Sequence, residues 1–131
     1  MIKAKKIGEV AKELSVNVDT LRYYEKIQLL DRIKRTENGI RLYSEEDIAR
    51  VTFIRQAQKV GFSLEEIAQL LIFRDNPIES KSRVRELVAK KLEVIEQRIH
   101  DLTALRDEFS QLTEQCINSK GGCPILKKFE S

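Results

Sequence analysis

The apolar positions between residues 7 and 27 predict two short helices joined by a turn. In residues 7–14 (IGEVAKEL), apolar side chains stand at positions 7, 10, 11 and 14, which is the spacing of one helical face. Residues 15–17 interrupt this face with types that favour turns and caps, and Asn17 or Asp19 then begins a second helix. The pattern is typical of a helix-turn-helix, although a helical hairpin in a bundle core has the same spacing.

A β-hairpin is expected next. Asn38 and Gly39 tolerate the positive φ that a tight turn demands, and they separate the short runs 32–35 and 40–43. These two runs therefore predict a pair of strands beside the helix-turn-helix.

Two capped helices follow the predicted hairpin. Ser44 stands before three acidic residues and predicts the N-cap of a helix with acids in its first turn. Ser63 and Glu66 form the pattern of a capping box for a helix over 64–73, which ends before Pro77.

From about residue 80 the apolar residues form a single long stripe. They fall in steps of three and four, at positions 84, 88, 92, 95, 99, 102, 105, 109, 112 and 116. A helix of about 35 residues would extend roughly 50 Å. Because so small a protein cannot cover such a stripe, we expect a homodimer joined by a coiled coil. A terminal helix folded back on its own domain is the alternative.

Composition and charge limit the class of protein. A chain of 131 residues suffices for one compact domain with an appendage, and no stretch approaches the roughly 20 apolar residues of a membrane span. The first sixty residues hold 13 Lys and Arg against 9 Asp and Glu, so the positive excess lies in the predicted helix-turn-helix. Because the basic N-terminus lacks the apolar segment of a secretory signal, we expect a cytoplasmic protein.

The sequence also resembles a known family. IGEVAKELSVNVDTLRYYEKIQLL and RTENGIRLYSEEDIARVTFIRQAQKVGFSLEEI are similar to the mercury-resistance-regulator (MerR) family of bacterial transcription factors, and the tail GGCPI is most similar to its copper(I)-responsive members. The resemblance implies a mainly α fold with three parts. These are a winged helix-turn-helix DNA-binding domain (1–75), a long antiparallel coiled-coil dimerisation helix (80–115) and an effector-binding loop with a short terminal helix (116–131).

The resemblance further implies an activator that acts on promoter DNA. Such a homodimer binds a palindrome within an overlong promoter spacer and distorts it so that RNA polymerase engages both promoter elements.

Seven residues are expected to contact this DNA. The Arg22 guanidinium suits a guanine or a phosphate, and a tyrosine hydroxyl can reach a phosphate, although Tyr24 is expected to lean inward with Leu21. Arg55 matches a phosphate-contacting arginine of the family, whereas Ile40 departs from the aromatic residue that most relatives carry in the wing. The expected DNA-binding residues are Arg22, Tyr23, Tyr24, Lys26, Arg35, Arg41 and Arg55.

The effector site is expected at Cys116 and Cys123, the only cysteines of the chain, while the lone His100 is expected at the surface. Two thiolates are too few for a structural zinc site but suit a soft monovalent ion such as Cu(I) or Ag(I). By the resemblance, divalent-metal sensors add a cysteine from the partner chain, and copper(I) sensors place a serine there. The matching residue here is Lys81, which cannot ligate when protonated but can offset the charge of a dithiolate.

Three functions remain open at this point. The first is a dimeric regulator sensing a soft monovalent metal ion, and the second is a metal-independent regulator whose thiols respond to oxidants or electrophiles. The third is a coiled-coil adaptor whose basic helices bind a protein. An enzyme is not expected, because the sequence has no glycine-rich phosphate loop and no nucleophile motif.

Overall fold

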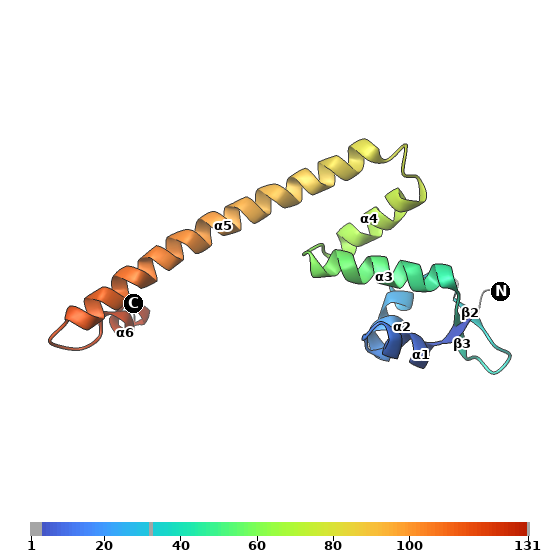
Figure 1. Cartoon of the computed structure of the whole chain (residues 1–131), viewed down its shortest axis with the longest axis horizontal. Coiled ribbons are helices and arrows are strands. Elements are labelled where there is room, and N and C mark those ends of the chain that lie inside the picture. The colour runs from blue at the N-terminus through green and yellow to red at the C-terminus, as the bar shows by residue number, and fades with distance from the viewer. Residues whose placement is uncertain (1–3, 32, 131) are drawn as a thin grey trace. The chain divides into compact units, whose positions relative to one another are not determined.

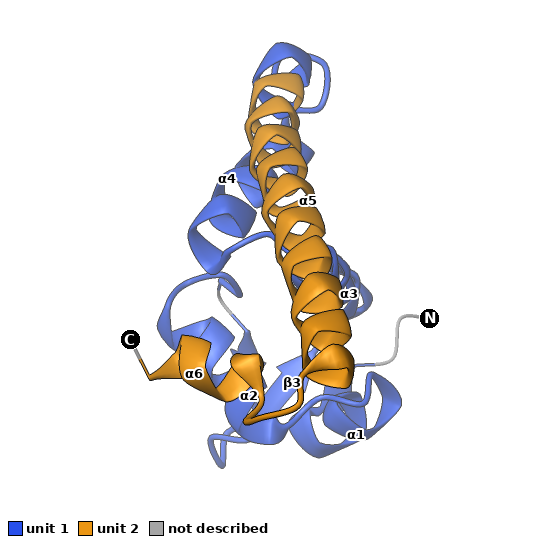
Figure 2. Ribbon diagram, turned by 90° about the vertical axis from the view of Figure 1, so that its left-hand side faces the viewer, with its two compact units in different colours: residues 1–84 blue, residues 85–131 orange. Residues whose placement is uncertain are grey.

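A computed structural model describes residues 4–31 and 33–130. Two compact units make up the chain, residues 1–84 and residues 85–131, and they are coloured separately in Figure 2. The elements, labelled in Figure 1, are β1 (Lys5–Lys6), α1 (Ile7–Glu13), α2 (Val18–Lys26), β2 (Lys34–Arg35), β3 (Arg41–Tyr43), α3 (Glu45–Lys59), α4 (Leu64–Asp75), α5 (Lys81–Asn118) and α6 (Pro124–Phe129). The mainly α fold with a small sheet confirms the predicted fold class.

The helix-turn-helix forms as the apolar spacing predicted. Val10 of α1 packs with Leu21 and Tyr24 of α2, and all three side chains are buried. The turn between the helices closes through Val16 N–H, which donates to the Ala11 carbonyl at 2.9 Å, while Ser15 adopts a φ of 53°. Burial of one apolar face on each helix therefore holds the pair together.

The hairpin belongs to a three-stranded sheet in the order β1-β3-β2. Its turn is closed by Gly39 N–H, which donates to the Thr36 carbonyl at 2.9 Å, and Gly39 has a φ of +82°. Arg35 stands opposite Arg41 in the antiparallel register of β2 and β3. Of the predicted run 32–35, residue 32 lies outside the described residues.

The predicted helix caps are present at both later helices. Ser44 accepts a hydrogen bond from Asp47 N–H at 3.1 Å, and Ser63 accepts one from Glu66 N–H at the same distance. In each case the acidic side chain bonds back to the serine N–H, which completes a capping box. The two helices cover the core of the N-terminal unit, whose buried apolar residues are Val10, Ala11, Leu21, Tyr24, Leu29, Leu30, Ile33, Tyr43, Val51, Ile54, Ile67 and Leu71.

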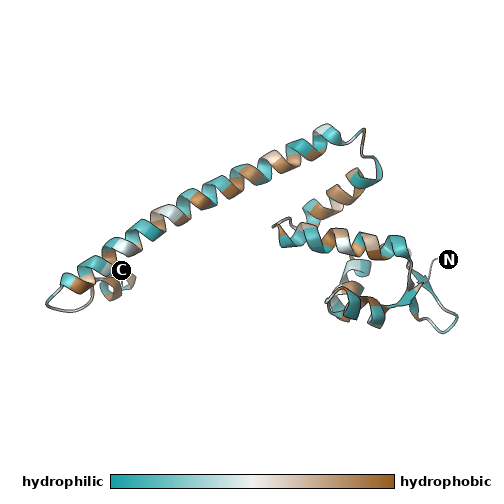
Figure 3. Ribbon diagram, viewed as in Figure 1, coloured by the Kyte–Doolittle hydropathy of each residue, from teal (hydrophilic) through white to brown (hydrophobic). Residues whose placement is uncertain are grey.

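The long helix α5 spans 38 residues and has no buried residue. Figure 3 shows apolar segments recurring along it, and the stripe side chains between positions 88 and 109 range from 40% exposed at Ile95 to 64% at Leu102. The helix continues to Asn118, beyond the expected end at residue 115, because no glycine or proline interrupts it before Gly121. Cys116 therefore lies in the last helical turn and not in the loop that follows.

Among residues 4–31 and 33–130, no helix is both long enough and apolar enough to cross a membrane.

Candidate DNA interface and thiol site

The exposed face of α2 carries Arg22, Tyr23 and Lys26. Tyr23 is 48% exposed, and Arg22 and Lys26 are also exposed, one helical turn apart on the same side. Arg22 Nη1 lies 3.5 Å from Asp19 Oδ1, a surface ion pair that holds the guanidinium only weakly. This face is therefore available to a partner outside the unit.

Tyr24 points the other way. Its side chain is 1% exposed, and its hydroxyl hydrogen-bonds to Gln58 Oε1 of α3. The expectation that Tyr24 leans inward is confirmed, and its burial argues against the direct DNA contact that the sequence also predicts for Tyr24. The physical reason is the helical period, which places residues 21 and 24 on the buried face.

The hairpin of β2 and β3 is the wing of this helix-turn-helix, and its two arginines converge on one acidic residue of α2. Arg35 Nη2 donates to Glu25 Oε1 at 2.8 Å, and Arg41 Nε donates to Glu25 Oε2. Sequence reasoning missed Glu25, because its partners lie 10 and 16 positions away and only the folded hairpin brings them to it. The one local signal for Glu25 was that it is the acid within the basic segment 21–26 (LRYYEK).

Tyr43 lies beside this cluster. Burial raises the pKa of its hydroxyl, and the Glu25 charge raises that pKa further. Among the residues that the structure describes, the Tyr43 hydroxyl is buried without a hydrogen-bond partner.

Arg55 of α3 lies at the helix-turn-helix turn. It lines a shallow polar hollow together with Ser15, Asn17 and Thr20, at the N-terminal end of α2. Asn17 is the N-cap residue of α2 but makes no side-chain capping bond. An arginine beside a helix N-terminus favours an anion such as a phosphate.

The two cysteines come together in the C-terminal unit. Cys116 lies in the last turn of α5 and Cys123 is the N-cap residue of α6, and their Sγ atoms are 2.7 Å apart without a disulfide. The loop between them is held by Ser119, whose hydroxyl donates to the Gly122 carbonyl at 3.2 Å and accepts from Gly121 N–H at 3.3 Å.

The two thiols are not equivalent. The hydrogen bond from Cys116 lowers the pKa of the Cys123 thiol, and the N–H groups of Ile125 and Leu126 lower it further. The same hydrogen bond raises the pKa of the Cys116 thiol. Cys123 therefore loses its proton first, and its thiolate accepts from the Cys116 S–H group.

Within the described residues, the metal ligands that one chain brings together are the two cysteines. The described residues contain no group of three or more His, Cys, Asp or Glu side chains arranged to hold a metal ion. His100 is exposed on α5, as predicted, and Lys81 is exposed at the first position of that helix.

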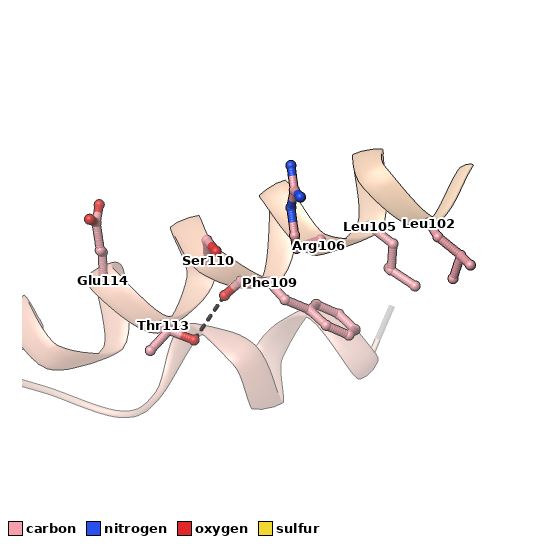
Figure 4. Close-up of a pocket in the computed structure, with 7 residues that line it drawn as sticks. All are labelled: Leu102, Leu105, Arg106, Phe109, Ser110, Thr113 and Glu114. Atoms are coloured by element: carbon pink, nitrogen blue, oxygen red, sulfur yellow. Dashed lines mark hydrogen bonds between the residues drawn. The ribbon is translucent and has the colours of Figure 1, made fainter. Parts of the chain in front are cut away.

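The surface of α5 next to α6 carries an open apolar groove. Figure 4 shows Leu102, Leu105 and Phe109 on one side of the helix, with Arg106 and Glu114 directed away from them. Lys128 of α6 pairs with Glu108 of α5. Leu102, Leu105 and Phe109 are between 42% and 64% exposed, so this chain alone does not cover them.

Comparison with known proteins places this geometry in one family. The family model described as MerR HTH family regulatory protein matches residues 5–72, and the one described as MerR, DNA binding matches residues 48–112. The HTH-type transcriptional regulator ZntR of Escherichia coli is 41% identical over 133 residues, which cover 95% of this chain and 92% of that protein.

Two further relatives carry metals in their descriptions. The mercuric resistance operon regulatory protein of Bacillus cereus is 38% identical and covers 93% of this chain and 94% of its own length. A transcription regulator of Ralstonia metallidurans, solved in complex with lead(II), superposes with a TM-score of 0.80 at 33% identity, over 95% of this chain and 98% of that one. The chain therefore belongs to the MerR family of helix-turn-helix transcription regulators.

Proposed function

We propose that two copies of this chain form a promoter-binding transcription activator that responds to a soft monovalent metal ion, Cu(I) or Ag(I), bound by Cys116 and Cys123. The observation that carries the metal site is the convergence of two free sulfurs, 2.7 Å apart, from the end of α5 and the start of α6. Thiolates are the ligands that soft metals prefer, and monovalent ions accept low coordination numbers. The Cys116 and Cys123 side chains, both as thiolates, would hold the ion, so its binding would favour loss of the thiol protons.

The number and charge of the ligands favour a monovalent ion. A cation with a single charge leaves a dithiolate site with one net negative charge. Lys81 of the second copy, at the start of its α5, would offset that charge, whereas an ammonium group offers no lone pair to a divalent ion. Relatives described with mercury and lead support a metal as the class of effector. A divalent ion is therefore the competing outcome of the test.

The DNA site combines the exposed face of α2 with the wing and α3. Arg22, Tyr23 and Lys26 would enter the groove, Arg35 and Arg41 would hold the backbone beside it, and Arg55 would bind a phosphate at the N-terminus of α2. Two such surfaces, joined by pairing of the apolar α5 stripes, would span a palindrome. Distortion of that promoter would let RNA polymerase engage both of its elements.

The metal assignment is tested by anaerobic titration of the full chain with Cu(I), Ag(I) and Zn(II) against a competing chelator. We expect the chain to bind about one Cu(I) tightly. Cys116→Ser and Cys123→Ser should each abolish this tight binding, while His100→Gln, a matched control on α5, should leave it unchanged. Tight Zn(II) binding with weak Cu(I) binding would contradict the proposal. Lys81→Cys should add a thiolate from the second copy and gain affinity for a divalent soft ion.

A second candidate function rests on the same pair of sulfurs. Because the Cys123 pKa is lowered and Cys116 lies in contact, a peroxide could oxidise Cys123 to a sulfenic acid, which Cys116 would then convert to a disulfide with loss of water. A regulator of this kind would bind no Cu(I) tightly and would change its DNA affinity on oxidation alone.

Binding to DNA separates both regulators from an adaptor. A duplex selected by the full chain from a randomised library should raise the fluorescence anisotropy at nanomolar protein, and a shuffled duplex should require far more protein. Equal affinity for the two duplexes would contradict a sequence-reading function.

A further inference from the structure

We infer that Glu25 is a positioning residue that fixes the wing against α2 and thereby sets the sequence specificity of DNA binding. The inference rests on the proposed DNA-binding function. It concerns a residue that would not itself touch DNA, since its carboxylate is engaged by two arginines.

The geometry of Glu25 is that of a clamp between two elements. Each carboxylate oxygen accepts from a different arginine, Oε1 from Arg35 at 2.8 Å and Oε2 from Arg41 Nε. The Glu25 side chain is only 19% exposed, so water screens these contacts less than it screens a surface pair. One residue of α2 therefore holds both strands of the hairpin.

Without Glu25 the two arginines would repel each other. Arg35 and Arg41 stand directly opposite in the register of β2 and β3, a position in which like charges destabilise a strand pair. The shared carboxylate offsets this repulsion and keeps both guanidinium groups at one edge of α2.

Both arginines retain donors for a phosphate. A guanidinium has five N–H donors, and among the described residues Arg41 uses only Nε for Glu25. Arg35 uses Nη2 for Glu25 and Nη1 for the Gly39 carbonyl at 3.5 Å. The clamp thus presents a pair of oriented cations to the DNA backbone at a fixed distance from the exposed face of α2.

Loss of the Glu25 carboxylate should strengthen sequence-independent binding to DNA and weaken binding to the preferred sequence. Removing the Glu25 charge raises the positive charge of the surface, which strengthens sequence-independent binding to phosphates. Removing the clamp also frees the wing from α2. The wing then no longer fixes the position of the α2 side chains on the bases, and the preference for one sequence falls. A purely electrostatic role would strengthen binding to every duplex, and a purely structural role would weaken binding to every duplex.

The test compares Glu25→Gln with Glu37→Gln, which removes the same charge from an exposed residue at the wing tip. The affinities of the full chain for the selected duplex and for its shuffled version are measured at two salt concentrations. We expect Glu25→Gln to lower the ratio of the two affinities by about tenfold while raising affinity for the shuffled duplex. Glu37→Gln should leave the ratio unchanged.

The outcome that overturns the inference is an unchanged ratio for Glu25→Gln in a chain whose wild type prefers the selected duplex. A wild type without that preference would instead remove the proposed function. Should Glu25→Gln fail to fold, Arg41→Lys keeps the charge but loses the planar guanidinium, and the same fall in the ratio is expected. Hydrogen exchange of the Arg41 Nε–H group provides a readout without DNA: slow in the wild type, fast in Glu25→Gln, and equal rates would also overturn the inference.

Discussion

The Sγ atoms of Cys116 and Cys123 lie 2.7 Å apart although the residues are seven positions apart in the chain. The approach results from where two helices end and begin. Cys116 is reached before α5 ends at Asn118, and Cys123 caps α6, whose first residue is Pro124. The polar loop between them reverses the chain, so one thiol donates to the other and the pair becomes unequal in acidity.

This inequality predicts a difference in reactivity. Because a thiolate is the nucleophile and the pKa of Cys123 is lowered, iodoacetamide should label Cys123 before Cys116 at neutral pH in the metal-free, reduced chain. Replacing the donor in Cys116→Ala should raise the Cys123 pKa and move its labelling profile to higher pH. Cys123→Ala should lower the pKa of Cys116. Mass spectrometry of timed samples measures both, and equal labelling rates in the wild type would contradict the asymmetry.

The two buried tyrosines predict opposite responses to loss of a hydroxyl group. Tyr24→Phe breaks the hydrogen bond to Gln58 and should lower the free energy of unfolding by about 1 kcal/mol. Tyr43→Phe removes a buried hydroxyl without a partner in the described part of the chain, so stability should stay equal or rise slightly. Urea unfolding of the two variants provides the comparison. A larger loss for Tyr43→Phe would show that its hydroxyl is bonded in solution.

The exposed face of α2 predicts that removing Arg22 lowers the affinity for the preferred DNA sequence. Arg22→Ala should weaken binding to the selected duplex by about 1–3 kcal/mol and reduce the preference over shuffled DNA. Tyr24→Phe is the matched control on the buried face of the same helix, and its DNA affinity should remain that of the wild type. Titration at fixed salt checks both, and an unchanged affinity for Arg22→Ala would remove this residue from the reading surface.

The phosphate contact proposed for Arg55 predicts a different effect on binding, because a phosphate contact carries no sequence information. Arg55→Ala should weaken binding to selected and shuffled duplexes alike and reduce the slope of log affinity against log salt by about 0.9. Lys127→Ala, on the short helix of the other unit, should leave the slope unchanged. A loss confined to the selected duplex would argue instead for a base contact by Arg55.

Local signals in the sequence were sufficient for most of the fold. Ser44 and Ser63 mark helix starts because a capping box needs only residues three positions apart. Asn38 and Gly39 likewise marked the turn of the hairpin. By contrast, β1 is two residues long, too short to show an alternating pattern, and its partner strand β3 begins only at Arg41.

In the candidate sites too, the local sequence indicated single residues but not the contacts between distant segments. The cysteine pair was visible because the chain has no other cysteines, but its asymmetry depends on the exact helix ends. The wing arginines were visible as charges, whereas their shared partner Glu25 was not, since nothing local ties position 25 to positions 35 and 41. Contacts between distant segments are fixed by tertiary packing, which periodicity does not encode.

If the proposed dimer pairs through the exposed stripe of α5, a charge placed on that stripe should separate its two copies. Leu102→Glu would bury an unpaired carboxylate between two paired α5 helices and should therefore shift the chain toward monomer. Ala104→Glu adds the same charge on the opposite side of the helix and should leave the assembly intact.

Sedimentation velocity of the wild-type chain at micromolar concentration, alone and with the selected duplex, measures whether two copies assemble and bind DNA as a pair. We expect a species of twice the 15.2 kDa chain mass that binds one duplex. A 15.2 kDa monomer that stays single and does not bind the duplex would contradict this expectation.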